Sequence, residues 1–253
     1  MQTLLLVLCK IIATVLLADF VAGFVHWVED AYAREDTPIL GPLVARANIV
    51  HHHYPRYFTR LSWWQSSWDL LCISTLLVLG AWYLGVLTWP VWLFVIISTN
   101  ANEIHKWEHR TRQENGPVIS WLQDHHILQS PRHHAIHHTN PKNVHYCTTT
   151  NLLNPVLDRL HFWDSLEWLL AHTLNIHRRP DTSVPGSGPA PAWLEAYRRP
   201  AAPAKHDCKN CPHAAQGKCP RARQNITNTP NLAFANHPPS TRTLSTKTPS
   251  CLC

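Results

Sequence analysis

Histidines are the residues of this chain with the clearest chemical potential, and many of them recur at helical spacing. The chain has 253 residues and 19 histidines, nine of which fall within residues 105–145. His105 and His109 are four residues apart, and the run HAIHH (134–138) gives spacings of three and four. Side chains at these spacings share one face of an α-helix. Each group therefore predicts a helix that presents several imidazoles in one direction.

Other parts of the chain repeat this pattern. They are the His26–Asp30 pair, the triplet His51, His52 and His53, the doublet His125 and His126, and the His133–His137 pair. So many imidazoles would repel one another if they were protonated together. A metal ion removes that repulsion because it binds the neutral ring. The pattern therefore predicts a metal site.

The number of histidines favours two metal ions over one. A catalytic zinc ion takes three protein ligands and a structural zinc ion takes four, fewer than the histidines available here. A soluble di-iron bundle would instead show several Glu-x-x-His pairs. Few carboxylates lie near these histidines, namely Asp19, Asp30, Glu103, Glu108 and Asp124. A histidine-dominated pair of sites suits iron, which can use O₂ to remove hydrogen from an acyl or alkyl chain entering from a bilayer.

The first apolar stretch predicts a membrane span over about residues 3–25. It is mostly Leu, Ile, Val and Ala, with a single Lys10, and is about as long as a bilayer crossing requires. A cleaved signal peptide is the alternative interpretation. The stretch lacks a basic leading segment and an A-x-A cleavage site, which favours a retained helix.

A second apolar stretch predicts two further spans, about 62–82 and 86–104. Residues 70–99 contain no charged side chain. One straight helix of that length would measure about 45 Å, too long for a hydrocarbon core of about 30 Å. Gly85 and Pro90 lie where a turn would divide it. The alternative is a buried helical hairpin of a soluble protein.

The distribution of Lys and Arg predicts the orientation. With three spans, residues 26–60 and those after about 105 lie on one face, which carries all Lys and Arg except Lys10. The opposite face, residues 1–3 and the turn near 84–90, carries none. The positive-inside rule then places the larger face in the cytoplasm. We expect an integral, multi-pass membrane protein whose active site faces the cytoplasm.

The expected fold is all-α, a polytopic membrane helical bundle with a cytoplasmic histidine-rich helical cap that holds a di-metal site. Residues 1–178 form the membrane domain, and its cap comprises 26–60 and 105–178. Pro, Gly and Ala dominate 179–203, which is typical of a linker. The rest divides into a Cys-containing segment, 204–223, and a tail, 224–253, that is too polar to fold.

The Cys-containing segment leaves two interpretations open. Cys208, Cys211 and Cys219, with His206 or His213 as a fourth ligand, would suit a small zinc or iron–sulfur site. A second C-x-x-C pair is missing, so a reduced, unstructured stretch is the alternative.

Five stretches together resemble a known family. They are DFVAGFVHWVEDAY (19–32), HHHYPRYFTR (51–60), NEIHKWEH (102–109), LQDHHILQSPRHHAIHH (122–138) and YCTTTNLLNPVLDRLHFW (146–163). In this order they resemble the integral-membrane lipid desaturases of the plasmanylethanolamine desaturase group, also called the Kua or CarF type. A plant plastid acyl-lipid desaturase is a more distant relative. HKWEH and HHAIHH resemble the two histidine boxes of that family.

The resemblance implies an O₂-dependent di-iron desaturase that receives two electrons from a cytochrome b5-like or ferredoxin-like protein. It implies that the metal ligands are His26, Asp30, His51, His52, His105, His109, His126, His133, His134, His137 and His138. The two boxes supply the catalytic set, which is His105, His109, His134, His137 and His138. The substrate would be a membrane lipid, either a 1-O-alkyl ether converted to a vinyl ether, as in plasmalogens, or an acyl chain.

Other functions compete with desaturation. A hydroxylase would share the architecture and return oxygen to the carbon. A membrane zinc hydrolase would need a carboxylate base beside the metal-bound water, a role open to Glu108. A metal transporter or sensor would need ionisable residues along a path through the membrane, whereas the histidines lie beyond the span ends. The net charge of +6 is accompanied by no nucleic-acid recognition motif.

Overall fold

The computed structural model describes residues 2–198 and contains only helices and connecting loops in that range. The chain divides into two compact units, residues 1–191 and 192–253. In chain order the helices of the first unit are α1 (Gln2–Tyr32), η1 (Gly41–Ala45), α2 (Arg46–His53), α3 (Pro55–Phe58), α4 (Trp63–Tyr83), α5 (Trp89–Thr99), α6 (Ala101–His109), α7 (Arg112–Asp124), α8 (Pro131–His137), α9 (Leu153–Arg159) and α10 (Phe162–Leu174). In the second unit the described residues contain one 3₁₀ helix, η2 (Ala192–Tyr197). The all-α expectation is confirmed for the described residues. The expected Cys-containing segment and tail, residues 204–253, lie outside them.

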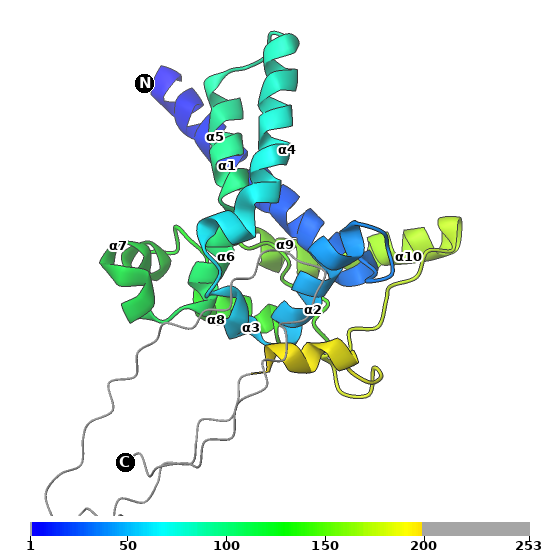
Figure 1. The fold of residues 1–253 in the computed structure, drawn as a ribbon. Helices are drawn as coiled ribbons and strands as arrows, with labels where there is room; N and C mark the ends of the chain where they lie inside the picture. Colours follow the sequence, from blue (N-terminus) through cyan, green and yellow to red (C-terminus); the bar gives the residue numbers. More distant parts are fainter. Residues whose placement is uncertain (1, 199–253) are drawn as a thin grey trace, which may run out of the picture. The chain divides into compact units, whose positions relative to one another are not determined.

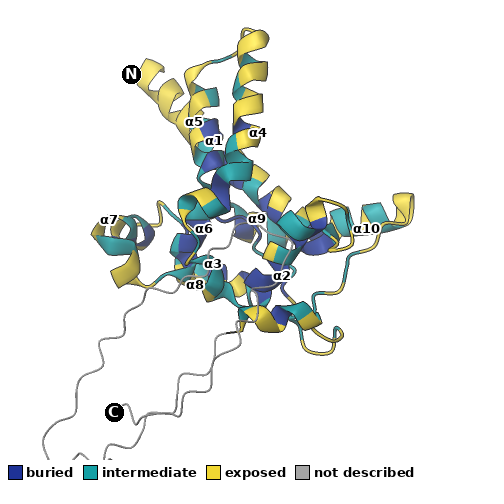
Figure 2. Cartoon of the chain, viewed as in Figure 1, coloured by how far each residue is buried: buried dark blue, intermediate teal, exposed yellow. Residues whose placement is uncertain are grey.

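Two helices, α1 and α4, are long and apolar enough to cross a membrane. With 31 residues, α1 is about 46 Å long at the usual rise per residue. Its first twelve described residues are exposed and mostly apolar, which suits contact with lipid (Figure 2). Burial begins at Thr14 and includes His26 and Asp30 near the other end. The helix is thus longer than the expected span 3–25, and its last two turns enter the cap.

The expected third span, 86–104, is two helices rather than one. The apolar helix α5 has 11 residues, which makes it about 16 Å long. It ends at Thr99, and only Asn100 separates it from α6, which begins at Ala101. It packs against both α1 and α4. Ser74 and Thr99 join the hairpin through a 2.7 Å hydrogen bond between their hydroxyls. The structure therefore divides the third expected span between a short apolar helix and the first turn of the helix that follows it in the cap.

Within the first unit, the apolar helix ends and the histidine-bearing helices lie at opposite ends. The N-terminal end of α1 and the turn between α4 and α5 lie at one end, and α2, α6 and α8 lie at the other (Figure 1). Most residues at the first end are exposed (Figure 2), and many of them are large apolar residues. Gly85 provides the positive φ of 67° that the turn requires. This arrangement places the histidine-bearing helices beyond the apolar helices.

The cap is built around the C-terminal part of α1. Trp27, Tyr146, Cys147 and Trp163 are fully buried and form its aromatic core. At Gly23 a side chain would place its Cβ 2.6 Å from the Cys147 sulfur, so the close approach of α1 to the segment 146–151 depends on this glycine. The same segment contacts α1 at a second point, through the side chain of Asp19.

The buried carboxyl group of Asp19 anchors the segment 146–151 to α1. It accepts hydrogen bonds from the backbone N–H groups of Thr149 at 2.7 Å and Thr150 at 3.0 Å. A third bond comes from the Thr150 hydroxyl at 2.6 Å. These bonds fix the loop that follows α8 and that contains the carbonyl groups facing two of the site histidines.

Candidate metal centre

Five imidazoles converge between α2, α6 and α8. One ring nitrogen from each lies within 4.8 Å of one from every other member. The Nε2 atom of His134 lies 3.0 Å from that of His105 and 3.1 Å from that of His138. We call this group the five-histidine cluster. Its members are His51, His105, His109, His134 and His138.

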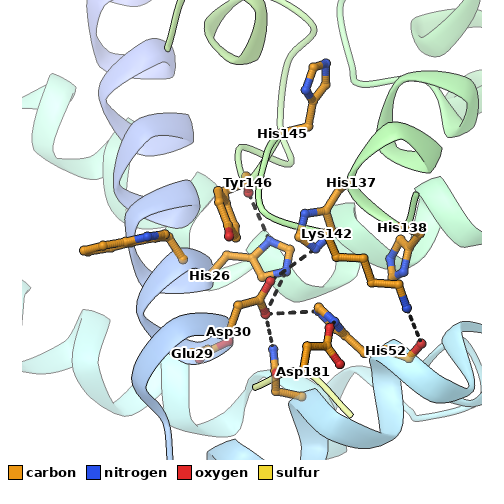
Figure 3. Close-up of polar contacts among 12 residues, drawn as sticks. His26, Glu29, Asp30, His52, His137, His138, Lys142, His145, Tyr146 and Asp181 are labelled. Atoms are coloured by element: carbon orange, nitrogen blue, oxygen red, sulfur yellow. Dashed lines mark hydrogen bonds and ion pairs between the residues drawn. The ribbon is translucent and has the colours of Figure 1, made fainter. Parts of the chain in front are cut away.

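Beside it lies a second group, the mixed cluster, whose members are His26, Asp30, His52 and His137. The carboxylate of Asp30 lies at its centre (Figure 3). One oxygen, Oδ1, is 3.1 Å from His52 Nε2 and 3.7 Å from His26 Nε2. The other, Oδ2, is 3.4 Å from His137 Nε2. All four side chains are buried, so the group forms an enclosed set of three nitrogens and a carboxylate.

The two clusters are immediate neighbours. The rings of His51 and His52 are 5.8 Å apart, those of His137 and His138 are 5.1 Å apart, and those of His26 and His105 are 5.2 Å apart. Consecutive residues of α2 and of the end of α8 therefore serve different clusters. Two metal ions held by these groups would share one buried centre.

Local sequence explains why the rings converge. His105 and His109 are one helical turn apart on α6 and face the same direction. The short helix α8 starts with Pro131 in its first turn, and the Ser130 side chain accepts a bond from the His133 N–H. This cap suits a helix N-terminus, and it sets the direction in which the HAIHH run points.

Hydrogen bonds from outer ring nitrogens orient the histidines of the mixed cluster. His26 Nδ1 donates to the Tyr146 carbonyl at 3.0 Å, and His137 Nδ1 donates to the Val144 carbonyl at 2.8 Å. His52 Nδ1 lies 2.7 Å from a carboxylate oxygen of Asp181. With Nδ1 carrying a proton, Nε2 of each ring is the nitrogen that faces the centre and would bind a metal ion.

Burial keeps most of the remaining imidazoles neutral. It lowers the pKa of His51, His105 and His134 well below the ordinary value, and neighbouring histidines lower it further. For His109, burial lowers the pKa to about 3. Burial also acts against a charge on His52, but the carboxylates of Asp30 and Asp181 overcome this and raise its pKa to about 9. The five-histidine cluster thus presents neutral rings, which is the form that binds metals.

Unsatisfied polar atoms show that these residues fit metal ions. The Nε2 atoms of His26, His52 and His137 are buried without a hydrogen-bond partner, as are Asp30 Oδ2 and both ring nitrogens of His51. Each buried polar atom without a partner costs about 1–3 kcal/mol. A pair of metal ions would satisfy the inward-facing atoms, and a set of eight imidazoles with one carboxylate suits iron, zinc or copper.

Of the eleven predicted ligands, the structure brings nine together and leaves two outside. His126 is exposed, and its Nδ1 lies 3.0 Å from the side-chain amide of Asn151. His133 packs its ring against that of His145, with centroids 4.7 Å apart. His137, four residues later, reaches the mixed cluster instead. Each of the five predicted catalytic histidines belongs to one or the other cluster. His137 is in the mixed cluster and the other four are in the five-histidine cluster.

Two acidic residues at the centre were not predicted to support the ligands. Asp181 contacts His52 from within the expected linker, where nothing in its spacing relates it to a histidine. Glu108 was considered only as the base of a zinc hydrolase. Its Oε2 lies 3.1 Å from His134 Nδ1, outside hydrogen-bonding alignment, and it faces the outer nitrogen of a cluster member. Burial, and secondarily Asp19, raises the pKa of Glu108 well above its ordinary value.

Comparison with known proteins identifies relatives of the chain. Residues 15–181 match the lipid desaturase domain family. The chain is 31% identical to a plasmanylethanolamine desaturase of Myxococcus xanthus over 70% of its length, and 33% identical to plasmanylethanolamine desaturase 1 of Mus musculus over 65%. It is 32% identical over 71% of its length to the chloroplastic fatty acid desaturase 4 of Arabidopsis thaliana.

The matched regions cover 64%, 65% and 55% of those three relatives, so this chain spans less than two thirds of each. No solved structure matches it significantly.

Proposed function

The chain belongs to the lipid desaturase family, a family of oxidoreductases, and we propose that it is an O₂-dependent di-iron desaturase of a membrane lipid. The observation that carries this proposal is the pair of adjacent buried clusters, which offers ligands for two metal ions. In the proposed reaction, –CH₂–CH₂– plus O₂, two electrons and two protons gives –CH=CH– plus two water molecules. Reduced iron with O₂ supplies an oxidant able to remove hydrogen from unactivated C–H bonds.

The protein's own contribution is to position the lipid chain and to keep the centre dry. Because α1 runs from the apolar end of the first unit into the mixed cluster, a lipid chain lying along it would reach the centre without crossing water. His26 and Asp30 lie on this helix. The aromatic core of Trp27, Tyr146 and Trp163 closes one side of the site. Excluding water protects a reactive centre from side reactions.

For the substrate, we propose the 1-O-alkyl chain of an ether phospholipid, converted to a vinyl ether as in a plasmalogen. Two relatives named plasmanylethanolamine desaturase support this choice. A second candidate substrate is the acyl chain of a membrane lipid, supported by the similarly distant fatty acid desaturase 4. The electrons would come from a separate cytochrome b5-like or ferredoxin-like protein.

We also propose that the protein is a multi-pass membrane protein whose metal centre faces the cytoplasm. The candidate spans α1 and α4 support membrane insertion. The concentration of Lys and Arg on the segments that form the cap supports the orientation.

Lipid analysis of a host that lacks vinyl-ether lipids tests both the reaction and the substrate. The host expresses the wild-type chain or His134→Ala and is supplied with a 1-O-alkyl glycerol. His125→Ala is the matched control, because this exposed ring bonds only its own helix, at the Trp121 carbonyl. We expect vinyl-ether species with the wild type and His125→Ala and none with His134→Ala. New unsaturated acyl species would select the second substrate, hydroxylated lipid would indicate a hydroxylase, and no histidine-dependent change would contradict desaturation.

A further inference from the structure

The segment that follows α10 turns back over the mixed cluster. We call residues 178–183 the strap. The Arg179 N–H donates to the Ala31 carbonyl at 2.7 Å, and the Arg179 guanidinium donates to Asn48 Oδ1 at 2.6 Å. Asn48 in turn donates to Asp30 Oδ1 at 2.6 Å. The strap is therefore tied both to the end of α1 and, through Asn48, to the carboxylate of the mixed cluster.

One carboxylate oxygen of Asp181 accepts hydrogen bonds from within the strap, and the other contacts a histidine of the mixed cluster. Oδ1 accepts hydrogen bonds from the Ser183 N–H at 2.8 Å and the Ser183 hydroxyl at 2.6 Å. Oδ2 lies 2.7 Å from His52 Nδ1, and the two side chains are only 10% and 2% exposed. Figure 3 shows Asp181 beside His52, opposite Asp30. The hydrogen bonds within the strap thus hold the carboxylate in place.

This geometry dictates which nitrogen of His52 is free. A carboxylate accepts hydrogen bonds and donates none, so its contact requires the proton on Nδ1. His52 Nε2, which faces Asp30 Oδ1 at 3.1 Å, is then the nitrogen left for a metal ion. A carboxylate bonded to the outer nitrogen also makes a histidine a stronger ligand. The other two histidines of the mixed cluster bond carbonyl groups in this way.

We propose that Asp181 is a positioning residue of the metal centre, which fixes the Nδ1–H form of His52 and aims its Nε2 at the metal ion of the mixed cluster. This inference rests on the proposed function. It makes the strap part of the metal centre, although the strap contributes no ligand of its own.

The test is metal retention by the full-length chain, purified in detergent and challenged with increasing chelator. Asp181→Asn keeps the size of the side chain. If its amide oxygen takes the Ser183 bonds, its amide NH₂ faces His52 Nδ1 and favours the wrong ring form. Loss of such a supporting partner typically lowers metal affinity about 10–100-fold. We expect wild type to retain two iron ions per chain at a chelator concentration where Asp181→Asn retains one.

Two further variants separate positioning from general support of the strap. Thr182→Val removes a 3.1 Å contact between the neighbouring Thr182 hydroxyl and His53, which is not a cluster member. It should retain both ions. Asp181→Glu keeps the carboxylate and should recover part of the lost affinity. Equal thermal midpoints of the metal-free forms would show that Asp181→Asn still folds.

Two results would overturn the role of Asp181. One is a wild-type retention curve for Asp181→Asn, and the other is an equal loss in Thr182→Val. A wild type that holds zinc and no iron would contradict the proposed function. In that case the comparison of variants still measures the role of Asp181, with zinc as the retained ion.

Discussion

At the scale of single residues, the metal centre depends on which nitrogen of each imidazole faces inward. Backbone carbonyls hold the outer nitrogens of His26 and His137, and Asp181 holds that of His52. The inward nitrogens of these three rings are buried without partners. Burying these nitrogens without partners lowers the free energy of unfolding, and a bound metal ion would offset that loss. Such a local cost is typical of a functional site.

At this scale we predict that alanine substitutions at His137 and His126 have different effects on the desaturated product. His137→Ala removes a ligand of the mixed cluster and should lower desaturated product at least about 100-fold, because each metal ligand is needed for the oxidant to form. His126→Ala changes an exposed ring outside both clusters and should leave product within about twofold of wild type. Quantitative lipid analysis, normalised to protein level, is the measurement. Equal losses in the two variants would mean that His126 acts in the centre after all.

Helical spacing predicted which histidines would face the same way, but not which groups would meet. The pairs on α6 and α8 follow from intervals of three and four residues. The interval also paired His133 with His137, yet the structure separates them, because the meeting of α8 with α1 and α2 decides which ring is enclosed. The contact between Asp181 and His52 joins residues 129 positions apart. No spacing rule reaches that far, so tertiary packing alone reveals it.

At the scale of elements, α1 connects the apolar end of the first unit to the metal centre. It carries the exposed apolar turns, the Asp19 anchor, the Gly23 contact with Cys147, and two members of the mixed cluster. The sequence predicted a membrane span over about 3–25 and a His26–Asp30 pair at helical spacing beyond it, but not that one helix contains both. Polar residues such as His26 and Asp30 end the apolar stretch, but they do not end the helix. They are buried, and α1 continues with them into the cap.

The Asp19 anchor gives a prediction for this helix. Asp19→Asn replaces an acceptor with an amide NH₂ that faces backbone N–H donors, so one buried bond is lost. The expected cost is on the order of 1.5–3 kcal/mol, seen as a lower thermal midpoint in detergent. Asp36→Asn is the control, because its ion pair with Arg34 is exposed and such pairs contribute at most about 1 kcal/mol. An Asp19→Asn midpoint no lower than that of the control would contradict the anchor.

At the scale of the whole molecule, the site lies where the exposed apolar helices meet the cap. The described apolar helices end at a cap whose polar groups are buried around the two clusters (Figure 2). In the proposed orientation, a lipid chain and small water-soluble reactants would approach the same centre from opposite directions. The sequence predicted this division from the charge pattern. It did not predict that α5 would be short, because no Gly or Pro within residues 91–109 marks the break at Asn100.

Orientation in the membrane follows as a prediction. A glycosylation acceptor with a flexible spacer, inserted after Gly85 in the α4–α5 turn, should be modified when the chain is expressed in a eukaryotic cell. The same cassette inserted after Gly186, in an exposed loop of the first unit, should not be modified. A mobility shift that glycosidase removes reports the outcome. Modification at the second position alone would invert the proposed topology.

The central claim is that the two clusters hold two iron ions in one chain, and metal analysis of the purified full-length protein measures this directly. The chain would be produced in iron-supplied cells, purified in detergent and assayed for iron and zinc per mole of protein. We predict about two iron ions per chain. Zinc without iron, or a single metal ion per chain in the wild type, would contradict the claim.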